Sequence, residues 1–423
     1  MTGIVSDSRD HASGWRLWAL LAALLLINAI SQIDRILPFI LAEAIKTDLG
    51  LSDTQIGLLT GAAFAVCYTL LSLPLARMSD RGSPRLVLLG CLLVWSVMTA
   101  LGGLGASFML LAITRFGVAF GEAGGMPAGH ALIARKVRPE RRGLALGLFS
   151  MGIPLGAMVG FAVGGAMADG IGWRMALMGA GALGGLAFVV AALVIGPTPP
   201  RAASQADRAP FLRACLQLMV SPGFRWLVVA AVAIGFASAP FYAFAAPFLI
   251  RTHGLSAADV GLSFGLLQGG LGVIGAVLGG RGLDRAVRSG RGRIIGLPGW
   301  LFLVCALTTT AALFAPTGWM SIILFMPTMF SFALLLPWAF GAAHLVAGPG
   351  RQAVATSLMM IGSGLAGPAL GPIIVGAVSD SAAAAGLDNT LGLGLLLLPI
   401  ASALTGVATL IANDRIAVTL RSR

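Results

Sequence analysis

Twelve long apolar blocks run through the chain, and each is long enough to cross a lipid bilayer as an α-helix. About 20 consecutive apolar residues are needed to cover the roughly 30 Å of hydrocarbon in a membrane. Strands of a membrane barrel would alternate apolar and polar residues instead, and these blocks do not alternate. The sequence therefore predicts an all-α integral membrane protein. The blocks lie at 15–41, 53–77, 86–105, 107–134, 143–168, 173–195, 225–249, 256–280, 295–314, 318–346, 352–378 and 391–412.

The distribution of charge supports this class. Of the 423 residues only 10% are charged, and the net charge is +12; a soluble protein carries roughly 25% charged residues. All but five of the 28 basic residues fall at cytoplasmic ends and loops, if the N-terminus is cytoplasmic. This is the positive-inside bias, so both termini are predicted to be cytoplasmic, and no nucleic-acid partner is expected. The exceptions are Arg35 and Arg115 inside helices, and Lys46, Arg174 and Arg251 outside.

The sequence gives no sign of a metal, a cofactor or covalent catalysis. The four cysteines are dispersed over predicted helices and a cytoplasmic linker, without a metal-binding spacing. No HExxH zinc motif and no GxxxxGK nucleotide loop occurs. We therefore expect no cofactor, no metal site and no enzymatic activity. An intramembrane lipid enzyme and a non-transporting receptor are the alternatives from other functional classes.

A polar stretch that opens with three prolines between 197 and 200 divides the blocks into two sets of six. We expect an N-terminal six-helix bundle at 1–195, a cytoplasmic linker at 196–224 and a C-terminal six-helix bundle at 225–423. The first block lacks the small-residue cleavage site of a signal peptide and is too long for one, so it is expected to remain as the first helix.

The two halves repeat each other in parallel. Gly50-Leu51-Ser52 before the second block recurs as Gly254-Leu255-Ser256 before the eighth, at an offset of 204 residues. Asp80-Arg81 after the second block recurs at the same offset as Asp284-Arg285. A weaker sequence similarity relates residues 160–169 to residues 371–380. Parallel repeats of this kind are typical of transporters.

With these motifs the chain resembles the major facilitator superfamily over essentially its whole length. The family's loop after helix two reads Gly-x-Leu-x-Asp-Arg-x-Gly-Arg-Lys; Asp80 and Arg81 match it, whereas Ala76, Ser83 and Pro84 depart from it. The resemblance implies two pseudo-symmetric six-helix bundles.

The repeated Asp-Arg pair predicts a cytoplasmic gate. A carboxylate beside arginines at a cytoplasmic helix end can pair with the other half and hold the inward side shut. The alternative is that these arginines only set topology. The predicted gate residues are Asp80, Arg81, Arg85, Asp284 and Arg285.

Four ionisable residues lie deep inside predicted helices: Asp34, Arg35, Arg115 and Glu122. A charge at the bilayer centre costs roughly 2.5–3.5 kcal/mol on insertion scales unless it is paired or faces a cavity. All four belong to the first and fourth blocks. Arg115 and Glu122 are seven residues apart and therefore share one helix face.

Asn28 and Gln32 precede Arg35 at the spacing that forms one polar stripe on a helix. We expect Arg35, Arg115, Asn28 and Gln32 to bind substrate. Moving an arginine away from a buried carboxylate favours protonation of that carboxylate, so Asp34 and Glu122 are the predicted proton-coupling residues. The alternative is two fixed salt bridges between helices, although buried pairs stabilise poorly.

The Asp-Arg pair late in the first helix and the run Arg115-Phe116-Gly117-Val118-Ala119-Phe120-Gly121-Glu122-Ala123 resemble the spinster branch of the superfamily. This resemblance implies export of amphiphilic lipids such as lysophospholipids or phosphorylated sphingoid bases, with proton coupling in bacterial members. The apolar second half supplies further substrate-binding candidates: Phe241, Tyr242 and Trp338.

We expect a monomeric secondary transporter in a bacterial-type inner (plasma) membrane, working by alternating access. Its expected partners are a small amphiphilic substrate, protons and the lipid bilayer. A drug or organic-anion carrier of the same fold is the nearest alternative.

Overall fold

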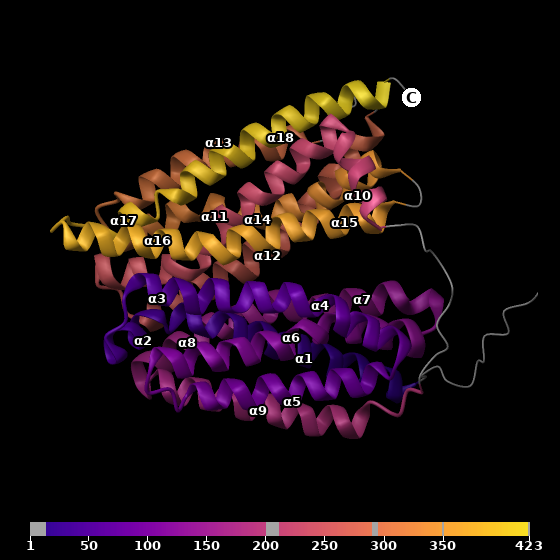
Figure 1. The fold of residues 1–423 in the computed structure, drawn as a ribbon, viewed down its shortest axis with the longest axis horizontal. Helices are drawn as coiled ribbons and strands as arrows, with labels where there is room; N and C mark the ends of the chain where they lie inside the picture. Colours follow the sequence, from indigo (N-terminus) through magenta and orange to yellow (C-terminus); the bar gives the residue numbers. More distant parts are fainter. Residues whose placement is uncertain (1–13, 200–210, 290–294, 349–350, 422–423) are drawn as a thin grey trace, which may run out of the picture. The chain divides into compact units, whose positions relative to one another are not determined.

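The computed structural model of the chain describes residues 14–199, 211–289, 295–348 and 351–421, and the regular structure in these ranges is helical (Figure 1). Twelve helical spans among the described residues are long and apolar enough to cross a membrane. The predicted all-α class with twelve transmembrane helices is therefore confirmed. Residues 200–210 of the expected linker lie outside the described residues. The elements are α1 Trp15–Ile40, α2 Ala42–Leu49, α3 Asp53–Gly57, η1 Leu58–Ala62, α4 Ala63–Arg81, α5 Pro84–Gly102, α6 Phe108–Lys136, η2 Pro139–Arg141, α7 Arg142–Ser150, α8 Gly152–Gly170, α9 Trp173–Val194, α10 Phe211–Val220, α11 Pro222–His253, α12 Ala257–Arg288, α13 Gly296–Leu313, α14 Gly318–Ala347, α15 Gln352–Ile361, η3 Gly362–Ala366, α16 Gly367–Ala384, α17 Thr390–Gly394 and α18 Leu397–Arg421.

Several helices extend beyond the apolar blocks that predicted them. The eighth block ends at 280, whereas α12 continues to Arg288. The seventh block begins at 225, whereas α11 begins at Pro222 with proline in its first turn. Hydropathy records only the part of a helix that lies in hydrocarbon, but helical hydrogen bonding continues through polar residues. The polar extensions are therefore invisible to the block pattern.

The chain forms two compact units. The first comprises Met1–Arg35, Cys67–Ala157 and Arg174–Ser204, and the second comprises Ile36–Val66, Met158–Trp173 and Gln205–Arg423. We use "outer" for the helix ends that the topology prediction places outside the cytoplasm. The second unit thus combines the expected C-terminal bundle with outer segments of the expected N-terminal bundle. The division into two six-helix bundles stays a prediction.

Close helix packing and aromatic contacts build the interiors of the units. In the first unit α5 lies against α6, where a Cβ on Gly121 would lie only 2.7 Å from the backbone nitrogen of Trp95. In the second unit α11 packs against α18, and α12 against α14 (Figure 1). Phe241 is fully buried there, with ring centroids 5.3 Å from Phe325 and 5.8 Å from Phe332.

The repeated Gly-Leu-Ser motif has the same local geometry in both copies. Gly50 ends α2 with φ 62°, and Gly254 ends α11 with φ 65°; glycine adopts this left-handed conformation without steric cost. Ser52 accepts a hydrogen bond from the Gln55 backbone nitrogen, and Ser256 caps α12 in the same way. The motif is therefore a helix stop followed by a helix start.

Candidate functional site

The buried charges of α1 and α6 come together in the first unit. Arg35 Nε lies 2.5 Å from Glu122 Oε2, and the Glu122 side chain is fully buried while that of Arg35 is 28% exposed. The Arg35 guanidinium also lies 4.5 Å from the ring centroid of Tyr68, within the range of a cation–π contact. This ion pair is a contact of the kind that the alternative interpretation, salt bridges between the two helices, expects.

Asp34 is bonded differently from Glu122. Its side chain is buried, and within the described residues neither carboxylate oxygen has a hydrogen-bond partner of normal geometry. Arg115 and Glu122 are its charged electrostatic neighbours. Arg115 Nη1 donates to the backbone oxygen of Asp34 at 3.4 Å. The Thr99 hydroxyl is the neighbouring donor of Asp34 but makes no hydrogen bond of normal geometry to it. The cluster therefore holds one directly ion-paired carboxylate and one without an ion pair or a well-formed hydrogen bond.

Two further residues of the predicted polar stripe contact neighbouring helices. Asn28 Nδ2 donates to the carbonyl oxygen of Phe149 at 2.7 Å, in the last turn of α7. Gln32 is half-buried, and a Cβ on Gly156 would lie 2.8 Å from its Cβ, which places α8 against it. The amide of Asn28 thus adds a side-chain donor to a carbonyl in the last turn of α7.

The predicted gate residues of the first unit lie at the cytoplasmic ends of α4 and α5. Arg85 donates to the carbonyl oxygens of Ile195 and Ala192 at the end of α9, at 2.5 and 2.8 Å. Asp80 and Arg81 are exposed, and the Asp80 carboxylate has no ion pair with a described residue. Arg85 therefore caps a helix.

In the second unit, Asp284 and Arg285 lie in the last two turns of α12. Asp284 lines a cleft of about 520 Å³, together with Arg288, His344 and Gln352. Within the described ranges Asp284 has no ion pair.

The three aromatic candidates of the second unit differ in accessibility. Phe241 is fully buried, and Trp338 is 4% exposed within an apolar cluster of α11, α14 and α18. Tyr242 is half-buried, and its hydroxyl accepts a hydrogen bond from Gln268 Nε2 at 2.9 Å. Tyr242 is therefore the candidate with both a polar group and partial access.

A network of ion pairs at the outer end of the second unit was missed by the sequence analysis. Arg251 of α11 donates to both carboxylate oxygens of Asp53, at 2.8 and 2.9 Å, and to both of Glu43, at 2.8 and 3.1 Å. Lys46 Nζ lies 2.5 Å from Asp53. Lys46 and Arg251 are two of the basic residues that depart from the positive-inside bias, and that departure was the available signal.

Two aspartates bind the N-termini of helices from the other half of the chain. The Asp380 carboxylate, on α16, accepts from the backbone nitrogens of Asp53 and Thr54, both at 2.9 Å. Asp169, on α8, accepts from the backbone nitrogen of Ala258 at 2.7 Å. A carboxylate satisfies the free N–H groups of a helix N-terminus and interacts favourably with its dipole. These bonds link α3 to α16 and α8 to α12.

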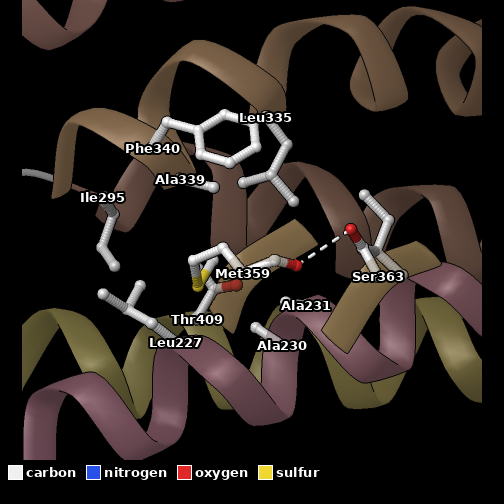
Figure 2. Close-up of a pocket in the computed structure, with 11 residues that line it drawn as sticks. Leu227, Ala230, Ala231, Ile295, Leu335, Ala339, Phe340, Met359, Ser363 and Thr409 are labelled. Carbon is white, nitrogen blue, oxygen red and sulfur yellow. Dashed lines mark hydrogen bonds between the residues drawn. The ribbon is translucent and has the colours of Figure 1, made fainter. Parts of the chain in front are cut away.

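Figure 2 shows a small apolar pocket in the second unit, lined from α11, α14, α15, η3 and α18. Its volume is about 50 Å³, and Ser363 within it donates to the Met359 carbonyl at 3.0 Å. Such a volume admits a small apolar group, not a whole amphiphile. The lining residues are Leu227, Ala230, Ala231, Ile234, Ile295, Leu335, Ala339, Phe340, Met359, Ser363 and Thr409.

The expectation that the sequence holds no Gly-x-Ser-x-Gly spacing of a hydrolase nucleophile is wrong, because Gly261-Leu262-Ser263-Phe264-Gly265 has it. This stretch lies inside α12, and Ser263 Oγ donates to the backbone oxygen of Asp259 at 2.7 Å. A nucleophile elbow requires a sharp strand-to-helix turn, so this spacing has no catalytic context.

Comparison with known proteins identifies a family. Residues 24–372 match the model of the Major Facilitator Superfamily. An "MFS-type efflux pump" of Mycolicibacterium smegmatis is 34% identical over 412 residues, covering 95% of this chain and 94% of the relative. "Protein spinster homolog 3" of Danio rerio is 28% identical, covering 86% of this chain and 77% of the relative. A crystal structure of a bacterial homolog of the human lysosomal transporter spinster, inward-facing and occupied, matches with a TM-score of 0.82 and 26% identity, covering 97% of this chain and 98% of that one.

Proposed function

This chain belongs to the major facilitator superfamily and to its spinster-like branch, and from that premise we propose that it exports an amphiphilic, lipid-like anion in exchange for protons. The family makes it a multi-pass membrane transporter rather than an enzyme. The observation that carries the proposal is the buried cluster of Asp34, Arg35, Arg115 and Glu122, in which one carboxylate is ion-paired and the other is not.

Asp34 is the proposed carrier of a proton. An ionised carboxylate that is buried without a hydrogen-bond donor is very costly, and such a group neutralises by binding a proton. Asp34 comes close to this condition, because both its oxygens are buried and, within the described residues, the nearby Thr99 hydroxyl makes no hydrogen bond of normal geometry to them. Arg115 binds the Asp34 backbone rather than its carboxylate. A small movement of the Arg115 guanidinium toward that carboxylate would then favour release of the proton.

Glu122 and Arg35 are the proposed link between proton and substrate. Arg35 is partly exposed, whereas Glu122 is fully buried. An anionic head group that binds Arg35 competes with Glu122 for the guanidinium. Glu122 would be left buried with a weakened partner and would therefore take up a proton. Substrate binding and protonation are coupled in this way through one arginine.

Alternating access assigns a role to the outer network of Glu43, Asp53 and Arg251. These bonds tie outer segments of the first half to helices of the second half within one compact unit. We propose that they close the outer side and break when it opens. The predicted cytoplasmic gate at Asp80 and Asp284 would close the cytoplasmic side when the outer side is open.

The lipid-like substrate is supported by the contrast between charged and apolar residues. In the first unit, Arg35 and Arg115 are cations suited to an anionic head group. In the second unit, the half-buried Tyr242, backed by the buried Phe241 and Phe332, is suited to an apolar part. The efflux name of the mycobacterial relative supports export. It equally favours the second candidate, a drug or organic-anion carrier. A monomer in the plasma membrane, with both termini cytoplasmic, completes the proposal.

Transport in proteoliposomes tests the proposal. Purified protein is reconstituted with a pH-sensitive dye inside, and lysophosphatidic acid is added across a range of concentrations. We expect a substrate-dependent pH change that is lost in Glu122→Gln and in Asp34→Asn. If both variants keep gradient-driven transport, the coupling role is wrong. If soluble organic anions give the proton-linked pH change and lysolipids do not, the drug or organic-anion carrier replaces the lipid exporter as the proposed function.

A further inference from the structure

Tyr242 and Gln268 form a polar pair within the aromatic cluster of the second unit. Gln268 Nε2 donates to the Tyr242 hydroxyl oxygen at 2.9 Å. The Tyr242 ring stacks with Phe39 at a centroid distance of 6.4 Å and lies 5.7 Å from Phe241 and 6.3 Å from Phe332. These rings place the hydrogen bond beside apolar groups, where electrostatic interactions are stronger than in water.

The pair has unused hydrogen-bonding capacity. Gln268 Oε1 is buried and has no hydrogen-bond partner within the part of the chain that the structure describes. A buried acceptor without a partner is unfavourable, and native proteins contain few of them. The Tyr242 oxygen accepts from Gln268, so its own hydrogen is available for a further acceptor. The pair therefore offers a bound molecule one unpartnered acceptor, Gln268 Oε1, and as donors the Tyr242 hydroxyl hydrogen and the second hydrogen of Gln268 Nε2.

The position of the pair along its helices places it deep in the membrane. Tyr242 precedes Gly254, which ends α11, by 12 residues, and Gln268 follows Ser256, which caps α12, by 12 residues. At about 1.5 Å per residue both lie roughly 18 Å from the outer helix ends, near the middle of about 30 Å of hydrocarbon. Polar residues at this depth typically mark a substrate pathway.

We propose that Tyr242 and Gln268 bind a hydroxyl group of the transported molecule. A hydroxyl donates to the unpartnered Gln268 Oε1 and accepts from the Tyr242 hydroxyl. A phosphate or carboxylate only accepts and leaves Oε1 without a donor, and an ammonium only donates and leaves the Tyr242 hydrogen without an acceptor. The oxygen and nitrogen of the Gln268 amide can also be assigned the other way round. Tyr242 would then donate to Oε1, and the free groups would be an amide N–H and the Tyr242 oxygen. A hydroxyl can again bind both of these groups.

This inference rests on the proposed function, because it takes a lysolipid as the transported molecule. A lysophospholipid has a free glycerol hydroxyl, which a diacyl lipid lacks because that position is esterified. A site built to hydrogen-bond a hydroxyl discriminates strongly against an analogue without it. Tyr242 and Gln268 would thus select the lyso form from the surrounding bilayer lipids.

The test compares lysophosphatidic acid, which carries one glycerol hydroxyl, with its 2-deoxy analogue. Binding to purified full-length protein is followed by intrinsic tryptophan fluorescence, and transport is followed separately in proteoliposomes. We expect the wild type to bind the hydroxylated lipid about 5- to 100-fold more tightly. Gln268→Leu and Tyr242→Phe should each reduce this preference to about twofold or less, by weakening binding of the hydroxylated lipid alone. Gln217→Leu, at an exposed position on α10, is the matched control and should keep the full preference.

The outcomes separate this inference from the proposed function. Proton-linked transport of both lipids without a hydroxyl preference overturns the subsite and leaves the proposed function intact. A hydroxyl preference in binding without proton-linked transport supports the subsite and overturns the coupling. If the variants weaken binding of both lipids equally, the pair is structural and the inference is wrong. If the wild type binds neither lipid, the lysolipid substrate and the subsite fall together.

Discussion

Replacing Arg251 by methionine removes the residue that joins Glu43 to Asp53. Methionine keeps the apolar stem of the side chain but makes none of the four hydrogen bonds that Arg251 donates to the two carboxylates. Asp53 retains Lys46 and the Ser379 hydroxyl, which donates to it at 2.7 Å. We expect the closed outer side to lose stability relative to the open one, while the fold is kept.

The magnitude follows from how far the network is buried. Removing one partner of a fully buried ion pair costs about 3–5 kcal/mol, and an exposed pair is worth about 0–1 kcal/mol. The side chains are 25% exposed for Arg251, 16% for Glu43 and 3% for Asp53, and Lys46 remains. We therefore expect a change of about 2 kcal/mol, which is about a 30-fold shift of the conformational equilibrium toward the open outer side.

Distances between spin labels at Thr47 and Leu387 measure this equilibrium, because both positions are exposed near the outer end of the second unit. The native cysteines are first replaced. In Arg251→Met, a longer distance between the two labels should be more populated than in the wild type. Glu43→Gln should give a smaller shift in the same direction. Arg225→Met, at an exposed position on the same helix, is the control. An unchanged distance distribution in Arg251→Met, with intact folding, would refute the role of the network.

Three further predictions concern other parts of the chain. Asp34→Asn keeps the neutral state of the residue, so we expect folding and substrate binding within about twofold of wild type, with loss of proton-driven accumulation in proteoliposomes. A side chain on Gly261 would overlap the backbone oxygen of Phe161, so Gly261→Val should also populate the longer distance between the two labels, whereas Gly270→Val, in open space, should not. Burial raises the pKa of the Cys215 thiol. Because the thiolate is the reactive form, its alkylation at pH 7 should be slower than that of a cysteine introduced at Gln217, and the half-maximal rate should lie at higher pH.

Local patterns in the sequence were sufficient for the helices and for the repeat. Block length depends only on the thickness of hydrocarbon, and the Gly-Leu-Ser motif depends only on the backbone of three residues. The sequence also indicated that the charges of the first and fourth blocks need partners or a cavity. It did not single out Arg35 with Glu122, and salt bridges between these helices were only the alternative interpretation. Each of these inferences rests on physics that acts over a short stretch or on a rare residue type.

The outer network and the Tyr242–Gln268 pair depend on which distant segments meet. Asp53 lies 198 residues before Arg251 and 327 before Asp380, and no local period connects such positions. Asn28 shows the same difficulty at closer range. Its place on the polar stripe was readable, but its partner is a carbonyl at the end of α7, 121 residues away. Tertiary packing decided which of several polar neighbours it meets.

The duplication predicts symmetry at the outer end, and the structure shows where that symmetry stops. Gly57 and Gly61 contact the backbone of α16, and Gly261 and Gly265, 204 residues later, contact the backbone of α8. Asp380 and Asp169 bind helix N-termini at the two crossings. The ion pairs, however, occur among the described residues at one crossing, because Asp53 has Ala257 as its counterpart at the same offset. Since backbone contacts and helix-capping bonds are shared, the ion pairs account for the main chemical difference between the crossings. The crossing of α3 with α16 is therefore the one where a change in charge would most strongly alter the closed state.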